Sequence, residues 1–215
     1  MADSLPRHDS KPSITDEQLL DRYRAGDGAA FDALVRRYQH ELFHFLIRFT
    51  GSRAAADDVF QEAFLQVHLS ADTFDIDRRF KPWLFTIASN KARDYLRRQA
   101  RRPTTTLSAP VGNSGSVASG GGDEPSFLDF MQADLPMPDQ ALEQSELTAR
   151  VRQSIDAMPD HLRQILLLSY FEKFSYQEIA EVLGVPLGTV KSRLHAAVAN
   201  FAERWKLANP SPENS

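Results

Sequence analysis

The stretch that decides the fold is Ser175-Tyr-Gln-Glu-Ile-Ala-Glu-Val-Leu-Gly-Val-Pro-Leu-Gly-Thr-Val-Lys-Ser-Arg-Leu194. Ser175 and Glu178 have the spacing of a capping box, which marks the start of a helix. Gly184 suits the left-handed residue that ends a helix, and Pro186 suits the first turn of the next one. The stretch therefore predicts a helix-turn-helix.

The second helix of this motif is predicted to have one apolar and one polar face. The apolar residues recur at helical spacing: Val190, Leu194, Ala197, Phe201 and Trp205. The polar residues near its start are Thr189, Lys191, Ser192, Arg193 and His195. Such a helix suits the major groove of DNA. Backbone amides near Ser175 and Tyr176 would add a phosphate contact at the start of the first helix.

Composition excludes several classes of protein. The chain has 215 residues, a formal net charge of -4 and no cysteine, so disulfides and thiolate metal sites are ruled out. We find no apolar run long enough to span a bilayer and no signal-peptide core near the N-terminus, and we expect a cytoplasmic protein without membrane insertion. No cofactor or metal is expected.

Charge is segregated along the chain. Basic residues crowd one short stretch: Lys91, Arg93, Arg97, Arg98, Arg101 and Arg102. From Pro103 to Ala149 there is no Lys or Arg, while Asp and Glu accumulate. Attraction to phosphate depends on the local patch rather than on the net charge. The acidic balance predicts weak binding of free DNA.

Helical periodicity predicts two all-α domains on a long tether. Caps at Thr15 (with Gln18), Asp27 and Ser52 begin three helices, and a fourth begins near Lys81-Pro82. The region from 103 to 138 is rich in Thr, Ser, Gly and Pro and is interpreted as a flexible acidic linker. The expected division is a disordered tail over 1–14, a first domain over 15–102, the linker over 103–138, a second domain over 139–206 and a disordered tail over 207–215.

An apolar island lies within this linker at Phe127, Leu128, Phe130 and Met131. It is either a transient contact or short helical turn, or a segment that docks on a partner. The sequence leaves both open.

The arrangement resembles an extracytoplasmic-function (group IV) RNA polymerase sigma factor of the sigma-70 family. Asp57-Asp58-Val-Phe-Gln61-Glu62-Ala-Phe64 resembles the segment of sigma region 2 that docks on the polymerase's largest subunit. Phe80 to Arg98 resembles the helix and preceding loop that read the minus-ten promoter element, and Ser175 to His195 resembles region 4, which reads the minus-thirty-five element. The resemblance implies a promoter-specificity subunit rather than an enzyme. Its expected partners are core RNA polymerase, promoter DNA and an anti-sigma factor.

Three sets of site residues follow from the resemblance. Polymerase binding is expected at Asp57, Asp58, Gln61 and Glu62, although such a row of acids also suits a solvated helix face. Minus-ten recognition is expected at Asn90, Lys91, Arg93, Arg97 and Arg98. Minus-thirty-five recognition is expected at Ser175, Tyr176, Thr189, Lys191, Ser192, Arg193 and His195. Trp83 and Phe85 are candidates for stacking on bases, with a core position favoured for Trp83.

One departure from the family pattern follows His195. Family members often carry further Arg or Lys there, whereas this chain has Ala196-Ala-Val-Ala-Asn200. Fewer cations predict fewer phosphate contacts and a shallower salt dependence.

Two other classes of function compete with this interpretation. The first is a free-standing helix-turn-helix regulator, which would need a dimer interface and tight DNA binding without polymerase. The second is a zinc metalloenzyme, because His40-Glu41-Leu-Phe-His44 matches the H-E-x-x-H pattern on a predicted helix. No third ligand is evident for that site.

Overall fold

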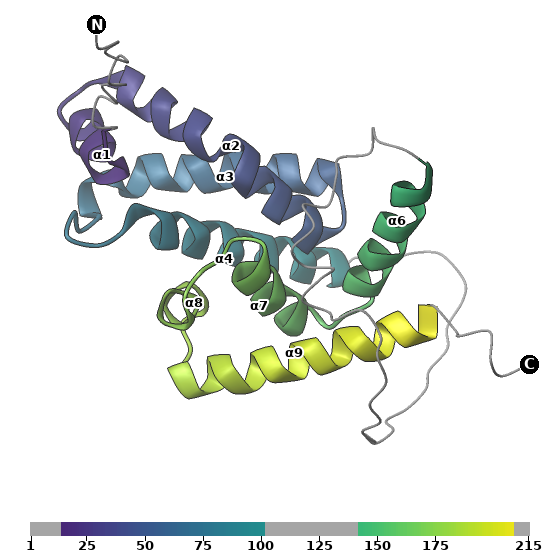
Figure 1. Ribbon diagram of the computed structural model, residues 1–215. Helices are drawn as coiled ribbons and strands as arrows, with labels where there is room; N and C mark the ends of the chain where they lie inside the picture. Colours follow the sequence, from purple (N-terminus) through teal and green to yellow (C-terminus); the bar gives the residue numbers. More distant parts are fainter. Residues whose placement is uncertain (1–13, 102–141, 209–215) are drawn as a thin grey trace, which may run out of the picture.

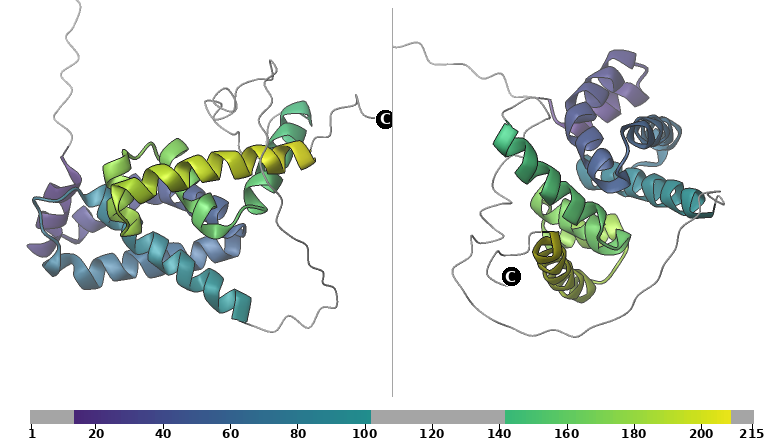
Figure 2. Two further views of the ribbon diagram at one scale, coloured as in Figure 1. Left: turned by 90° about the horizontal axis from the view of Figure 1, so that it is seen from below. Right: turned by 90° about the vertical axis from the view of Figure 1, so that its right-hand side faces the viewer.

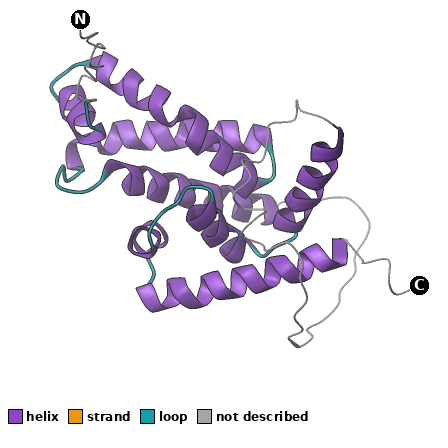
Figure 3. Ribbon diagram, viewed as in Figure 1, coloured by secondary structure: helices purple, strands orange, loops and turns teal. Residues whose placement is uncertain are grey.

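The computed structural model describes residues 14–101 and 142–208, and every regular element within those ranges is a helix (Figures 1 and 3). The first unit contains α1 (Asp16–Arg24), α2 (Gly28–Thr50), α3 (Arg53–Ser70), the 3-10 turn η1 (Ala71–Thr73) and α4 (Phe80–Arg101). The second unit contains α6 (Leu142–Asp156), α7 (Asp160–Tyr170), α8 (Tyr176–Leu183) and α9 (Leu187–Ala208). The all-α fold in two helical units is confirmed. The whole predicted linker, 103–138, with its apolar island, and residues 1–13 and 209–215 of the predicted tails lie outside the described residues. Leu207 and Ala208, expected in the C-terminal tail, instead belong to the last turn of α9.

The capping signals in the sequence begin and end the helices as predicted. Thr15 and Ser175 each form a reciprocal capping box, and Asp27 accepts a hydrogen bond from the Ala29 amide at 3.0 Å. Gly51 and Gly184 end α2 and α8 with φ of 73° and 63°. These left-handed angles favour glycine because a Cβ atom would clash with the backbone.

A long-range contact starts α4, the helix that carries most of the predicted minus-ten residues. The Glu17 carboxylate of α1 accepts a hydrogen bond from the Phe80 amide at 2.9 Å. Nearby, the Arg24 guanidinium donates to the Ala71 carbonyl, which fixes the loop before α4. The N-terminus of α4 is therefore held by α1.

The helix-turn-helix of the second unit is built from α8 and α9, with α7 packed against both. Ile179 of α8 and Val190 of α9 are fully buried, and Ile165, Leu166 and Leu167 of α7 are equally buried. This packing leaves the polar start of α9 at the surface, as a DNA-reading helix requires.

The two units pack directly on each other. Their buried apolar residues form one contiguous cluster within the described part of the chain. In Figures 1 and 2, α8 lies beside α4, and α7 lies between α2 and α9. The sequence predicted two domains on a tether and gave no sign of this contact.

Candidate nucleic-acid and protein interfaces

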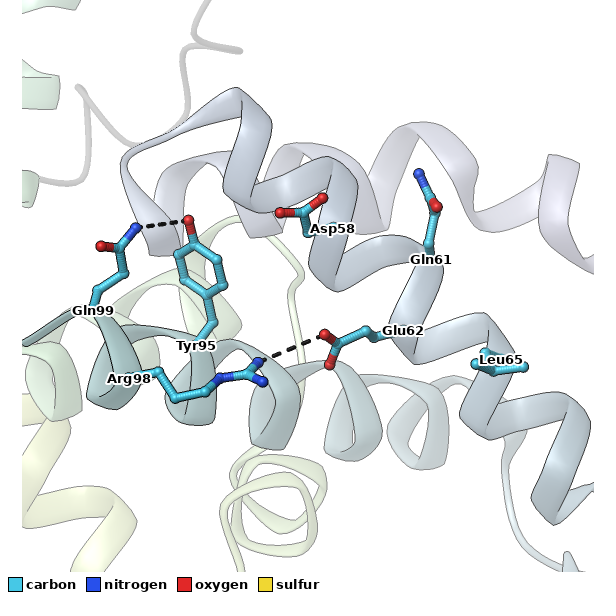
Figure 4. A pocket seen from close by; sticks show the side chains of 7 residues that line it. All are labelled: Asp58, Gln61, Glu62, Leu65, Tyr95, Arg98 and Gln99. Carbon is cyan, nitrogen blue, oxygen red and sulfur yellow. Dashed lines mark hydrogen bonds and ion pairs between the residues drawn. The ribbon is translucent and has the colours of Figure 1, made fainter. Parts of the chain in front are cut away.

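A groove of about 680 Å³ separates α3 from α4 (Figure 4). It is lined by Asp58, Gln61, Glu62, Leu65, Tyr95, Arg98 and Gln99. An ion pair of 3.6 Å between Glu62 and Arg98 crosses it, and the Gln99 amide donates to the Tyr95 hydroxyl at 2.8 Å. The structure therefore brings the predicted polymerase-binding acids beside the basic end of the predicted minus-ten helix.

The polymerase-binding candidates remain accessible. Asp57, Asp58 and Gln61 are exposed, and Glu62 is half-buried beside Arg98. In Figure 4 the Gln61 side chain points away from α4. This face of α3 is free to receive a protein partner.

Two leucines on the same helix were missed by the sequence analysis. Leu65 and Leu69 of α3 are 58% and 67% exposed, although leucine is usually buried. They follow Gln61 and Glu62 at helical spacing and lie out of phase with the buried stripe of Val59, Ala63 and Val67. The helical spacing of these two leucines could have revealed the exposed apolar row from the sequence. The row places an apolar surface next to the acidic side chains of α3.

The basic face of α4 forms a second, smaller groove of about 280 Å³, which Glu62 of α3 also lines. Its other lining residues are Lys91, Asp94, Arg97, Arg98 and Arg101. Arg97 pairs with Asp94 at 2.6 Å, and the Asn90 side-chain oxygen accepts a hydrogen bond from Arg93. Arg97 and Arg98 are exposed, so cationic groups of α4 point to solvent, as contact with a phosphate backbone requires.

The two aromatic candidates on α4 differ. Trp83 is half-buried against Phe74 and Phe80, with ring centroids 4.6 and 5.8 Å away, so it packs at the edge of the core rather than inside it. Phe85 is fully buried beside Phe45 and Phe174, so the expectation that it stacks on bases is wrong for this conformation.

The start of α9 presents most of the predicted minus-thirty-five residues. Lys191, Ser192 and His195 are exposed, and the Ser192 hydroxyl donates to the Thr189 carbonyl at 3.1 Å. Tyr176, at the start of α8, is 43% exposed. All four side chains are open to solvent.

Arg193 is the exception, because it faces the first unit. It lines a groove of about 450 Å³ together with Arg93 and Arg97 of α4 and His161 and Gln164 of α7. Burial lowers the pKa of Arg93; Asp94 acts against this, and the like charges of Arg97 and Arg193 add to it. Cations from both predicted DNA-reading helices thus share one narrow groove.

The H-E-x-x-H residues have other contacts. Glu41 forms an ion pair with Lys81 of α4, and the rings of His40 and His44 lie 4.2 Å apart. Burial, followed by the charge of His40, lowers the pKa of His44. No group of three or more metal-ligating side chains occurs within residues 14–101 and 142–208. None of the helices described there is long and apolar enough to cross a membrane.

The described residues combine an exposed helix-turn-helix with a basic helix beside an acidic face, an arrangement typical of DNA-binding proteins. Family comparison narrows the class. Sigma-70 region 2 matches residues 34–102, and Sigma-70, region 4 matches residues 148–200. The chain belongs to the extracytoplasmic-function group of the sigma-70 family of RNA polymerase sigma factors. It is a transcription initiation factor and not an enzyme.

Relatives match over most of their length. RNA polymerase sigma-H factor of Pseudomonas aeruginosa is 36% identical, over 85% of this chain and 89% of that one. ECF RNA polymerase sigma factor SigW of Bacillus subtilis is 32% identical, over 83% and 90%. ECF RNA polymerase sigma-E factor of Escherichia coli is 34% identical, over 86% and 91%.

A solved structure shares the helical fold of this protein over most of its length. CnrH in complex with the cytosolic domain of CnrY matches with a TM-score of 0.62 and 25% identity, over 91% of this chain and 99% of that one. The likeness spans both helical units.

Proposed function

We propose that the two units divide promoter recognition between them while core RNA polymerase holds both. The first unit, residues 15–102, docks on polymerase through Asp57, Asp58, Gln61 and Glu62 and contacts the minus-ten element through α4. The second unit, residues 139–206, contacts the minus-thirty-five duplex through α8 and α9. Linkage on polymerase raises the effective concentration of each unit at its own element, so weak separate contacts become specific together.

The groove between α3 and α4 is the observation that best supports the proposed roles of the first unit. It places an acidic, partly apolar docking face directly beside exposed cations. A polymerase bound to α3 would therefore hold the opened strand against α4. Asn90, Lys91, Arg93, Arg97 and Arg98 are the residues proposed for this contact.

On α9, we assign Lys191, Ser192 and His195 to base edges, because all three are exposed. Thr189 and Arg193 are assigned to phosphates, together with the start of α8 at Ser175 and Tyr176. The absence of cations over Ala196–Asn200 predicts a weak upstream contact that depends on polymerase.

Two further assignments complete the proposal. The protein acts in the cytoplasm, where its polymerase is. An anti-sigma factor is its proposed inhibitor, because a solved structure of the same fold contains the sigma factor RpoE of Bartonella quintana in complex with the anti-sigma factor NepR.

Run-off transcription tests the proposal. Purified core polymerase is supplied with the promoter upstream of this chain's own operon, with and without the chain. A specific transcript is expected only with the chain. Equal transcription without it would overturn the proposal, and strong specific gel-shifts by the chain alone would instead favour the free-standing regulator.

A further inference from the structure

The segment of residues 171–178, called here the docking segment, enters the surface formed by α2 and α4. Its Phe174 is 6% exposed and packs edge-on against Phe85 of α4, with ring centroids 5.1 Å apart. Arg48 of α2 lies over the ring of Phe171, 4.3 Å from its centroid. Two aromatic side chains of the second unit are thus seated on the first.

A charged cluster lies between these rings. Glu172 is 6% exposed, and Lys81 of α4 donates from Nζ to its backbone carbonyl at 3.4 Å. The same Nζ pairs with Glu41 of α2 and lies 4.9 Å from the ring centroid of Phe174. Lys81 therefore bridges the Glu41 carboxylate of the first unit and the Glu172 backbone of the second, which favours one register for the docking.

Ion pairs at the solvent-exposed edge of this contact are consistent with the same register. Arg79 pairs with Glu178 of the docking segment, and Arg78 lies 3.9 Å from Glu181 of α8. Exposed pairs contribute about 0–1 kcal/mol each, so the rim orients the units more than it holds them. The aromatic and buried contacts provide most of the attraction.

Docking leaves no room for a duplex between the two DNA-contacting helices. The groove shared by Arg93, Arg97 and Arg193 has a volume of about 450 Å³, which is the size of a small-molecule pocket. Promoter elements named minus-ten and minus-thirty-five are roughly 25 base pairs apart, or about 85 Å of duplex at about 3.4 Å per base pair. Arg93 and Arg193 cannot reach both while they line one groove.

We propose that the α2–α4 surface is a self-docking site for residues 171–178, and that promoter binding requires this site to be vacated. The free chain is closed by its own second unit without a partner protein. The consequence for promoter binding depends on the function proposed above, whereas the docking does not.

Distances between two labels test the docking. The chain has no cysteine, so Arg36→Cys on α2 and Ala199→Cys on α9 introduce the two labelling sites. Pulsed electron paramagnetic resonance on the free chain should give one narrow distance distribution. Glu172→Lys should broaden it toward longer distances, because it places a second cation against Lys81. Glu203→Lys makes the same charge change at an exposed site on α9 and should leave the distribution unchanged.

A charge swap distinguishes loss of docking from a general folding defect in Glu172→Lys. Adding Lys81→Glu to Glu172→Lys restores opposite charges in the cluster and should recover the narrow distribution, with circular dichroism unchanged throughout. A broad distribution in the parent protein, no response to Glu172→Lys or no recovery in the double variant would each overturn the self-docking.

DNA binding by the same proteins tests the consequence. If fewer than one chain in ten is open, opening it strengthens the apparent affinity about tenfold or more. Glu172→Lys should therefore bind a minus-thirty-five duplex at least about tenfold more tightly than the parent chain, and Glu203→Lys should not. Altered distances with unchanged affinity would leave the docking standing and refute its effect on promoter binding.

Discussion

Phe174 of the second unit packs edge-on against Phe85 of α4, with ring centroids 5.1 Å apart and ring planes at 75°. Edge-to-face pairs of this kind contribute about 0.5–1.5 kcal/mol beyond the apolar area that they bury. Because Phe85 also contacts Phe45 of α2, the pair links the second unit to the core of the first. The stability of one unit should therefore depend on the other.

Replacing this side chain should uncouple the two units. Phe174→Ala removes a buried aromatic ring, a change that costs about 3–5 kcal/mol in a packed core. We expect calorimetry to show two unfolding transitions in place of one cooperative transition. Leu207→Ala is the control, because Leu207 is 71% exposed. A single transition at the parent temperature in the Phe174 variant would contradict the coupling.

Docking should weaken as the pH rises. Burial, followed by the neighbouring Glu41 carboxylate, raises the pKa of Glu172 from 4.5 to about 8, while Lys81 of α4 and Arg48 of α2 act against the rise. The docked chain therefore holds a proton that an open chain releases. This contribution is complete below about pH 4.5 and is lost as the pH rises through about 8.

The label distances check this pH dependence directly. The narrow distribution expected at pH 6 should broaden by pH 9. Glu172→Gln keeps the shape of the side chain without its titration, so the change between the two pH values should be reduced. An equal change in parent and variant would show that another group is responsible.

Glu17 should matter for the start of α4. Burial acts to raise its pKa, but the hydrogen bond from the Phe80 amide and further hydrogen bonds outweigh it, and the pKa lies below 4.5. Its contribution is therefore present above pH 4.5 and is lost as the pH falls through the lowered value. Glu17→Ala should reduce the free energy of unfolding by about 1 kcal/mol at neutral pH, as for other lost caps. Urea titration measures the loss, and Asp21→Ala on the same helix should change it little.

The exposed face of α3 should govern polymerase binding. Asp58→Arg with Gln61→Ala should abolish co-purification with core polymerase while circular dichroism stays unchanged, because the new cation repels a basic partner surface. Leu65→Asp should weaken the same contact by removing its apolar part. Asp32→Arg changes an exposed acid on α2 and serves as the control. Normal recovery of polymerase with the double variant would refute the assignment.

Salt dependence should count the phosphate contacts. Arg97→Gln removes one proposed contact, so the slope of log affinity against log salt for holoenzyme binding to promoter DNA should fall by about one. Arg36→Gln, on the exposed face of α2, should leave the slope unchanged. An unchanged slope for Arg97→Gln would remove this residue from the DNA contact.

Local signals predicted the helices well. Helix ends depend on interactions within a few residues, so a single sequence is enough to predict them. Examples are the capping boxes at Thr15 and Ser175 and the helix-ending glycines Gly51 and Gly184. The buried face of α9 followed for the same reason, since Val190, Leu194 and Phe201 repeat at the helical period.

Contacts between distant helices were beyond the sequence. Glu41 was considered as part of a metal-binding pattern, whereas the structure pairs it with Lys81, 40 residues away. Arg193 was expected to face DNA, whereas it lines a groove with Arg93. Periodicity defines which face of a helix is polar, but the choice of partner depends on crossing angles that no local pattern encodes.

The most direct test of a closed free chain that opens on polymerase is the label distance in the holoenzyme. The doubly labelled chain is measured alone and with a slight excess of core polymerase, in a preparation that gives specific run-off transcripts. We predict that the short, narrow distribution of the free chain is replaced by one that is longer by several tens of ångströms, on the order of the roughly 85 Å between the two promoter elements. An unchanged short distance in a transcribing holoenzyme would contradict the account.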